Sequence, residues 1–155
     1  MNDTIPLHVA IALSQVGVRE SPKGSNRGPD VDKYTGGRAE PWCAHFVAWC
    51  FREAGKPIPG DTVPTPRRAN QLASVTRTEA IFGQHDWLVS EPKVGDIVFF
   101  KTRGRSDRGP GRHIGIVSAV GINDFEIVDG NWGDAVTRRK VKRSSADVSG
   151  FGRMP

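Results

Sequence analysis

The sequence predicts an α+β fold, with helices in the first half of the chain and an antiparallel sheet in the second. Apolar residues recur at helical spacing near the N-terminus, and the continuous apolar segment 41–54 fits a buried helix. After about residue 95 the pattern changes to short, closely spaced strands. The chain has 155 residues, 37% of them hydrophobic, which suffices for one domain with a substantial core. We therefore expect residues 1–155 to form a single domain.

The first half predicts a helix, a loop and a second short helix. Residues 4–16 repeat apolar side chains every three or four positions, and Gly17 is a suitable end for that helix. Residues 17–30 are polar and rich in Gly and Pro, as in a surface loop. Residues 29–37 are expected to hold one short helical turn before the next break.

The buried helix is expected at 41–54. Pro41 favours the first helical position, and Gly55 favours the end. Nearly every side chain from 42 to 51 is apolar, and a helix that is apolar all round lies inside the protein. A third helix is predicted from Thr65 through Val75.

The second half predicts five strands, at residues 96–100, 113–120, 125–129, 135–141 and 150–154. A turn at 121–124 separates the second strand from the third. The charged segment 101–112 is expected to be a mobile surface loop that ends at His113.

The two cysteines lie seven residues apart in the predicted buried helix. At the helical rise their Cα atoms would be about 10 Å apart, whereas a disulfide needs less than about 7 Å. We therefore expect Cys43 and Cys50 to be free thiols.

Cys43 is the candidate nucleophile because it lies at the N-terminal end of this helix. Free N–H groups and the helix dipole stabilise a thiolate there, and the same N–H groups suit an oxyanion. The competing interpretation is a buried small hydrophobe, which describes most free cysteines and fits Cys50 well.

His113 opens a predicted strand after the charged loop, and its ordinary pKa suits a general base. Asp129 and Asn131, near the end of the next strand, are candidates to orient the imidazole. A solvated histidine and an ordinary Asp-Gly-Asn turn are the competing interpretations. The sequence does not decide whether Asp129 or Asn131 is the orienting residue.

Three aromatic residues are candidates for substrate contact: Trp42, Trp132 and Tyr34. Trp42 precedes the proposed nucleophile and Trp132 follows Asn131, so both could form walls of a site. Core packing is the competing role, and for Tyr34 a core contact near Val31 is the simpler expectation.

The spacing of Cys43, His45 and Cys50 matches no zinc motif, and no phosphate-binding loop or calcium-binding loop is present in the sequence. We therefore expect no metal and no cofactor. His45 is expected to be structural.

The formal charge is +5, with a sequence pI near 9.6. A basic surface suits an anionic partner, although solubility alone could account for it. The Lys and Arg residues follow no nucleic-acid motif, and no apolar run is long enough to cross a membrane. Because the N-terminal residues do not resemble a signal peptide, we expect synthesis in the cytoplasm and later release or delivery to any outside substrate.

Four motifs together resemble the CHAP amidase/endopeptidase family, relatives of the NlpC/P60 hydrolases with a papain-like arrangement. They are W-C-x-x-F-V from Trp42, VGDIVFF from Val94, HIGIV from His113 and IVDGN from Ile127. The resemblance extends from about Val18 to the last residues.

This resemblance implies a Cys-bearing helix packed on an antiparallel sheet, and hydrolysis of an amide bond in bacterial peptidoglycan. It assigns Cys43 as nucleophile, His113 as base, Asp129 as orienting acid where many members have Glu, and Asn131 as a further site residue. Calcium is not expected, because Glu40 is the only acidic residue shortly before Cys43. The expected chain is one catalytic domain without a separate wall-binding module.

Three functions remain open at this stage. The first is a monomeric peptidoglycan amidase or endopeptidase, acting as a phage endolysin or as an injected toxin with an immunity protein in its producer. The second is a papain-like acyl transferase or peptidase that acts on a protein. The third is a catalytically silent module that binds the cell wall.

Overall fold

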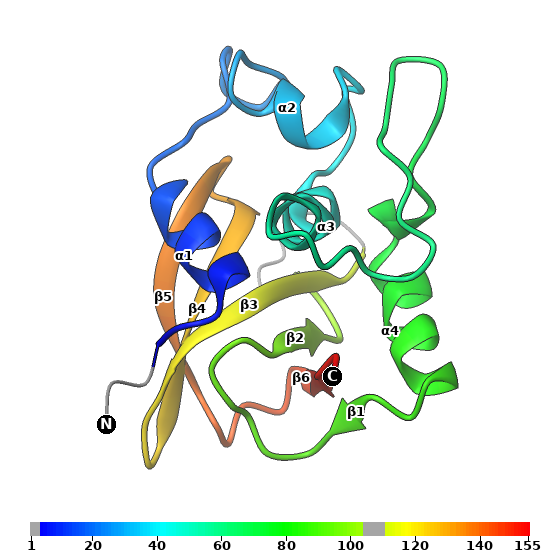
Figure 1. Ribbon diagram of the computed structural model, residues 1–155. Coiled ribbons are helices and arrows are strands. Elements are labelled where there is room, and N and C mark those ends of the chain that lie inside the picture. The colour runs from blue at the N-terminus through cyan, green and yellow to red at the C-terminus, as the bar shows by residue number, and fades with distance from the viewer. Residues whose placement is uncertain (1–3, 104–110) are drawn as a thin grey trace.

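The computed structural model describes residues 4–103 and 111–155 (Figure 1). The helices are α1 (Leu7–Ser14), α2 (Asp32–Thr35), α3 (Cys43–Glu53), the 3₁₀ helix η1 (Gln71–Ala73) and α4 (Val75–Gln84). The strands are β1 (Leu88–Val89), β2 (Ile97–Phe100), β3 (His113–Val120), β4 (Asp124–Trp132), β5 (Ala135–Lys142) and β6 (Val148–Gly152). Most of the predicted charged loop, residues 104–110, lies outside the described residues. Within the described part of the chain, no helix is long and apolar enough to cross a membrane.

The strands form one sheet in the order β1-β6-β2-β3-β4-β5, with antiparallel pairing throughout. The α+β prediction is therefore confirmed. The sheet curls strongly, because the ring of Phe125 on β4 packs 5.3 Å from that of Phe151 on β6 although two strands lie between them.

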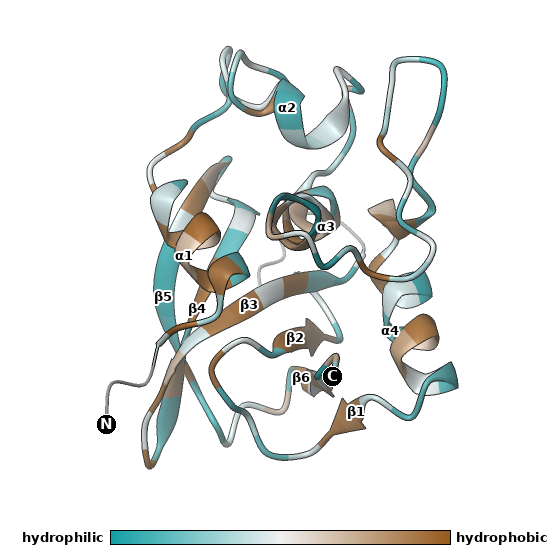
Figure 2. Cartoon of the chain, in the orientation of Figure 1, coloured by the Kyte–Doolittle hydropathy of each residue, from teal (hydrophilic) through white to brown (hydrophobic). Residues whose placement is uncertain are grey.

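The core lies mainly between the helices and one face of this sheet. Helix α3 contacts β3, β4, α1 and α2, and Figure 1 shows it lying over the middle of the sheet. Its side chains are buried on nearly every side, as its composition predicts. Figure 2 shows brown, hydrophobic segments in α1, α3, β2 and β3. A second apolar cluster fills the opposite, concave face of the sheet.

A glycine allows α3 to lie directly against β4. A Cβ atom added at Gly130 would come 2.7 Å from the Cβ of Phe46 and 2.9 Å from the Trp42 ring. Real atoms do not approach so closely, so any larger residue would push the start of α3 away from the strand. This packing brings the N-terminal end of α3 to the sheet.

The predicted helix from Thr65 to Val75 is wrong. Thr65 and Arg68 instead close a turn with two backbone hydrogen bonds, of 2.9 and 3.1 Å. The Asn70 side chain caps η1, and the Ser74 side chain accepts from the Arg77 N–H to begin α4. Two N-cap residues in succession thus divide the segment, and the long helix comes after it.

Other elements differ from the prediction at their ends. Helix α1 begins at Leu7, and Pro41 lies before the Trp42 cap of α3 instead of inside the helix. Strand β1, with two residues, is too short to produce an alternating pattern and was not predicted.

Candidate active site

Cys43 is the first residue of α3. The first helical hydrogen bond runs from the Phe46 N–H to the Trp42 carbonyl, at 2.9 Å. The N–H groups of the residues before Phe46, Cys43 among them, therefore have no partner within the helix. The residue is only 5% exposed. Its thiol lies at the positive end of the helix dipole, where a thiolate is favoured.

His113 is the first residue of β3, and its side chain contacts both Cys43 on α3 and Asp129 on β4. Its Nε2–H donates to the Asp129 Oδ2 at 2.7 Å, and the ring also hydrogen-bonds with the Cys43 thiol. Since Nε2 faces the carboxylate, Nδ1 is the nitrogen left for the thiol. The structure therefore brings Cys43, His113 and Asp129 together in one chain of hydrogen bonds.

The environment of His113 shifts its proton affinity strongly. Burial lowers the pKa of the imidazole, but the hydrogen bonds to Asp129 and Cys43 outweigh burial and raise this pKa to about 9. The ring therefore carries a proton at neutral pH.

Asp129 is fully buried on β4, and each of its oxygens has a donor. Besides His113, the Thr137 hydroxyl donates to Oδ1 at 2.6 Å and the Arg139 Nε donates to Oδ2 at 2.9 Å. A buried carboxylate needs such partners, because an unpaired one is costly. Thr137 and Arg139 lie on β5, whose alternation places them on the same side of the sheet as Asp129.

Trp132 lies beside the candidate base, as expected, with its ring centroid 5.3 Å from that of His113. The Arg139 guanidinium lies 3.4 Å from the centroid of the Trp132 ring. Together with Phe100, these side chains line a cavity of about 240 Å³ that extends toward Asp147. This cavity is the concave surface adjacent to His113.

Trp42 and Tyr34 do not line this cavity, and both are completely buried. The Tyr34 hydroxyl donates to the Gln15 side chain of the segment after α1 at 2.6 Å, and its ring packs 5.7 Å from Trp42. Their burial argues against the expected contact with substrate. The aromatic wall expected from Trp42 is instead a core contact that supports the start of α3.

Asn131 lies in β4, where the ladder to β5 is irregular between Asp129 and Trp132. Its φ of 59° is a left-handed conformation, which asparagine tolerates better than most residues. Residues 129–131 are therefore part of a strand and not an isolated turn. The Asp129 carboxylate accepts the hydrogen bond from the imidazole.

The remaining polar groups of α3 are structural. His45 is buried and hydrogen-bonds to Glu40 at 2.7 Å, which ties the segment before the helix to the helix itself. Burial lowers the pKa of His45, although Glu40 opposes this effect. Both Cys43 and Cys50 are free thiols, as predicted. Among the described residues, no group of three potential ligands could hold a metal ion.

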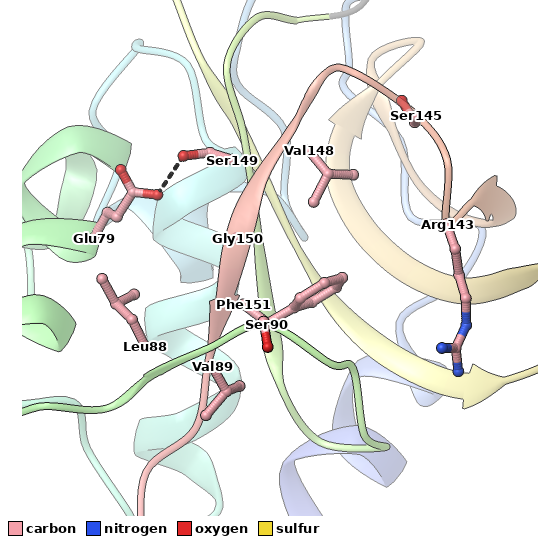
Figure 3. Close-up of a pocket in the computed structure, with 10 residues that line it drawn as sticks. All are labelled: Glu79, Leu88, Val89, Ser90, Arg143, Ser145, Val148, Ser149, Gly150 and Phe151. Carbon is pink, nitrogen blue, oxygen red and sulfur yellow. Dashed lines mark hydrogen bonds between the residues drawn. The ribbon is translucent and has the colours of Figure 1, made fainter.

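A larger cavity lies elsewhere, over β6 and β1 (Figure 3). Its volume is about 420 Å³, and its lining includes Leu88, Val89, Phe151 and the Ser149–Glu79 hydrogen bond. None of the candidate catalytic residues lines it. Of the candidate catalytic residues, His113 lines the smaller cavity, together with Trp132 and Arg139.

Sequence reasoning missed Thr137 and Arg139 as site residues. The signal that could have found them is the alternation of β5, in which every second side chain shares a face with Asp129. Using it requires the register of β4 against β5, which the sequence does not contain.

A helix-terminal cysteine, hydrogen-bonded to a histidine that a carboxylate orients, is the arrangement of cysteine hydrolases. The CHAP domain matches residues 33–131, more than half of the 155-residue chain, and the chain belongs to this family. Its members are typically cysteine hydrolases or amidases related to peptidoglycan.

The fold is also similar to a solved structure. This is a protein described as similar to lipoprotein, of the NLP/P60 family, from Staphylococcus aureus subsp. aureus Mu50. The TM-score is 0.51 at 18% sequence identity, and the match covers 99% of this chain and 42% of that one. At this identity the likeness supports the fold alone. The comparison with curated proteins gives no match.

Proposed function

We propose that this chain is a cysteine amidase or endopeptidase that cleaves an amide bond in bacterial peptidoglycan. The observation that carries the proposal is the hydrogen-bonded chain Cys43–His113–Asp129 in a member of the CHAP family. The net charge of +5 also suits the anionic bacterial wall.

In the proposed reaction the Cys43 thiolate attacks the carbonyl carbon of the amide. The first-turn N–H groups of α3 stabilise the oxyanion of the tetrahedral intermediate. His113 donates its proton to the amine nitrogen as the C–N bond breaks, which leaves a thioester on Cys43. The neutral ring then takes a proton from water, which attacks the thioester and releases the new carboxylic acid and the Cys43 thiolate, with the proton left on His113.

Asp129 acts by holding His113 in this scheme. Its carboxylate accepts the Nε2–H, which fixes the tautomer and leaves Nδ1 toward Cys43. Asn131 is retained as the further site residue that the family resemblance implies. Trp132 and the adjacent cavity are the proposed contact surface for substrate.

The test is digestion of purified peptidoglycan, with the soluble products identified by mass spectrometry. Cys43→Ala should lower fragment release to background, whereas Cys50→Ala should release fragments at a rate close to that of the wild type. Cys50 is a matched control, since it is a second buried free thiol on the same helix. The new end groups identify the bond that is cut, at the muramoyl–alanine amide or within the stem peptide.

Two results would contradict the proposal: no fragments from the wild type, or activity that depends on Cys50 instead of Cys43. Iodoacetamide titration gives a reading that needs no substrate. Cys43 should react at neutral pH, and Cys50 should not, because burial raises the pKa of the Cys50 thiol well above its ordinary value.

The biological setting is a separate proposal. A lytic enzyme of a phage or prophage is the setting we favour, and an injected antibacterial toxin with a partner immunity protein is the other. Expression inside a bacterium with and without a holin, a protein that opens the inner membrane, tests the first. Lysis only in the presence of the holin is the expected result.

A further inference from the structure

The carboxylate of Asp129 has a partner that a simple cysteine–histidine–acid arrangement does not need. Oδ2 accepts from His113 Nε2 at 2.7 Å and also from Arg139, whose Nε and Nη2 atoms both lie 2.9 Å away. One oxygen thus serves the candidate base and a permanent cation together.

Arg139 is itself held in place by two aromatic rings. Its guanidinium lies 3.4 Å from the centroid of Trp132 and 5.7 Å from that of Phe100. A planar guanidinium can lie over a ring while its edge donates to a carboxylate, which an ammonium group cannot do. The side chain is only 23% exposed, so water screens these contacts poorly.

We propose that Arg139 is a positioning residue of the active site, which holds the Asp129 carboxylate against His113 and fixes Trp132 beside it. This proposal rests on the function proposed above, because it assumes that His113 is the base. Arg139 acts through Asp129 and need not touch substrate.

Arg139 also limits how strongly Asp129 attracts a proton onto His113. The described titratable groups that face the imidazole are Cys43 from α3 and Asp129 from β4, with Arg139 from β5 behind Asp129. Asp147, before β6, lines the same cavity. Without Arg139 the full charge of Asp129 would act on the ring. The imidazolium would then lose its proton less readily, and activation of water would slow.

The experiment is a ¹⁵N-imidazole NMR titration of His113 in the full chain. Arg139→Met should raise the pKa of His113 by about one unit and lower kcat by about 10-fold, with little change in KM. Arg139→Lys keeps the charge and should restore most of the pKa. Arg138→Met is the matched control, since Arg138 is the adjacent, largely exposed arginine of β5 and pairs with Glu126 instead. It should leave the pKa unchanged.

An unchanged His113 pKa together with an unchanged kcat in folded Arg139→Met would overturn the proposal, even if thermal stability falls. A lowered pKa would instead show that Arg139 acts by positioning Asp129 and not through its charge. If Arg139→Met does not fold, Arg139→Gln replaces it, because the amide still donates to Asp129 while the charge is gone. The titration needs no substrate. Failure of the wild type to digest peptidoglycan would therefore contradict the proposed function and leave this test intact.

Discussion

Two opposing effects meet at His113. Burial favours the neutral imidazole, whereas the Asp129 carboxylate and the Cys43 thiol favour the charged one, and their combined effect is the stronger. The proposed reaction needs both forms in turn, because the leaving amine takes a proton and the attacking water gives one up. The pKa of about 9 therefore suits the first step better than the second.

Replacing Asp129 with Asn should shift this balance and leave the shape of the site nearly unchanged. Without the carboxylate, the pKa of His113 should fall toward its ordinary value of 6.5, since burial then opposes the charged ring with less compensation. The alkaline limit of kcat/KM should move to lower pH, and activity at neutral pH should fall by about 10²- to 10⁴-fold. A pH–rate profile checks both effects. An unchanged alkaline limit would mean that Asp129 does not control His113.

The site lies where three elements meet: the first residue of α3, the first residue of β3, and the second half of β4. Regular elements hold such residues more accurately than loops do. The relative position of α3 and the sheet then decides whether the thiol reaches the imidazole. Gly130 sets that position, because its missing side chain is the space that Phe46 and Trp42 occupy.

Gly130→Ala should therefore separate the nucleophile from the base. The added Cβ, 2.7 Å from that of Phe46, should destabilise the fold by about 1–3 kcal/mol and abolish rapid alkylation of Cys43. Gly150→Ala is the matched control in β6, since nothing lies within 4 Å of its added Cβ. Urea unfolding and iodoacetamide labelling measure the two effects. Equal behaviour of the two variants would show that the close packing at Gly130 is unimportant.

Elements with a strong local signal were predictable. β3 spans His113–Val120 as predicted, and α3 differs from its prediction by two residues at the start and one at the end. Both are continuous apolar runs bounded by turn-rich segments, and such runs are visible in the sequence. Cys43, His113 and Asp129 were found for a related reason, because each lies at or near the end of such an element.

Features that depend on packing between elements were not predictable. The third helix was predicted at 65–75, whereas α4 begins at Val75, after the Ser74 cap. Many serines in a sequence could cap a helix, so the sequence alone does not show which one does. The roles of Thr137 and Arg139 follow from the register of β5 on β4, and the burial of Trp42 follows from the fit of α3 against Gly130. None of these is a property of one segment.

For the whole molecule, a backbone hydrogen bond joins the loop before α2, at Glu20, to Asp134, the residue before β5. The Glu20 N–H donates to the Asp134 carbonyl at 3.0 Å, and Asn26 donates its N–H to the Glu20 carboxylate. Burial and the neighbouring Asp134 carboxyl raise the pKa of Glu20 to about 7. Folding therefore favours the protonated form of the Glu20 carboxyl, so the contribution of this residue to stability depends on pH.

The contributions of Glu20 and His113 to the free energy of unfolding should fall as pH rises, whereas His8 and His45, whose pKa values are lowered by burial, contribute in the opposite direction below pH 6.5. A group whose pKa is raised by folding binds more protons in the folded state between its two pKa values. For Glu20 this interval runs from 4.5 to about 7, and for His113 from 6.5 to about 9. Glu20→Gln should reduce the change in the free energy of unfolding across the first interval by about 1–2 kcal/mol and leave the change across the second interval as it is. The control Glu91→Gln alters an exposed carboxylate and should affect neither interval. Urea unfolding at intervals of pH measures this. The same pH dependence in Glu20→Gln and in the wild type between pH 4.5 and 7 would contradict this contribution of Glu20.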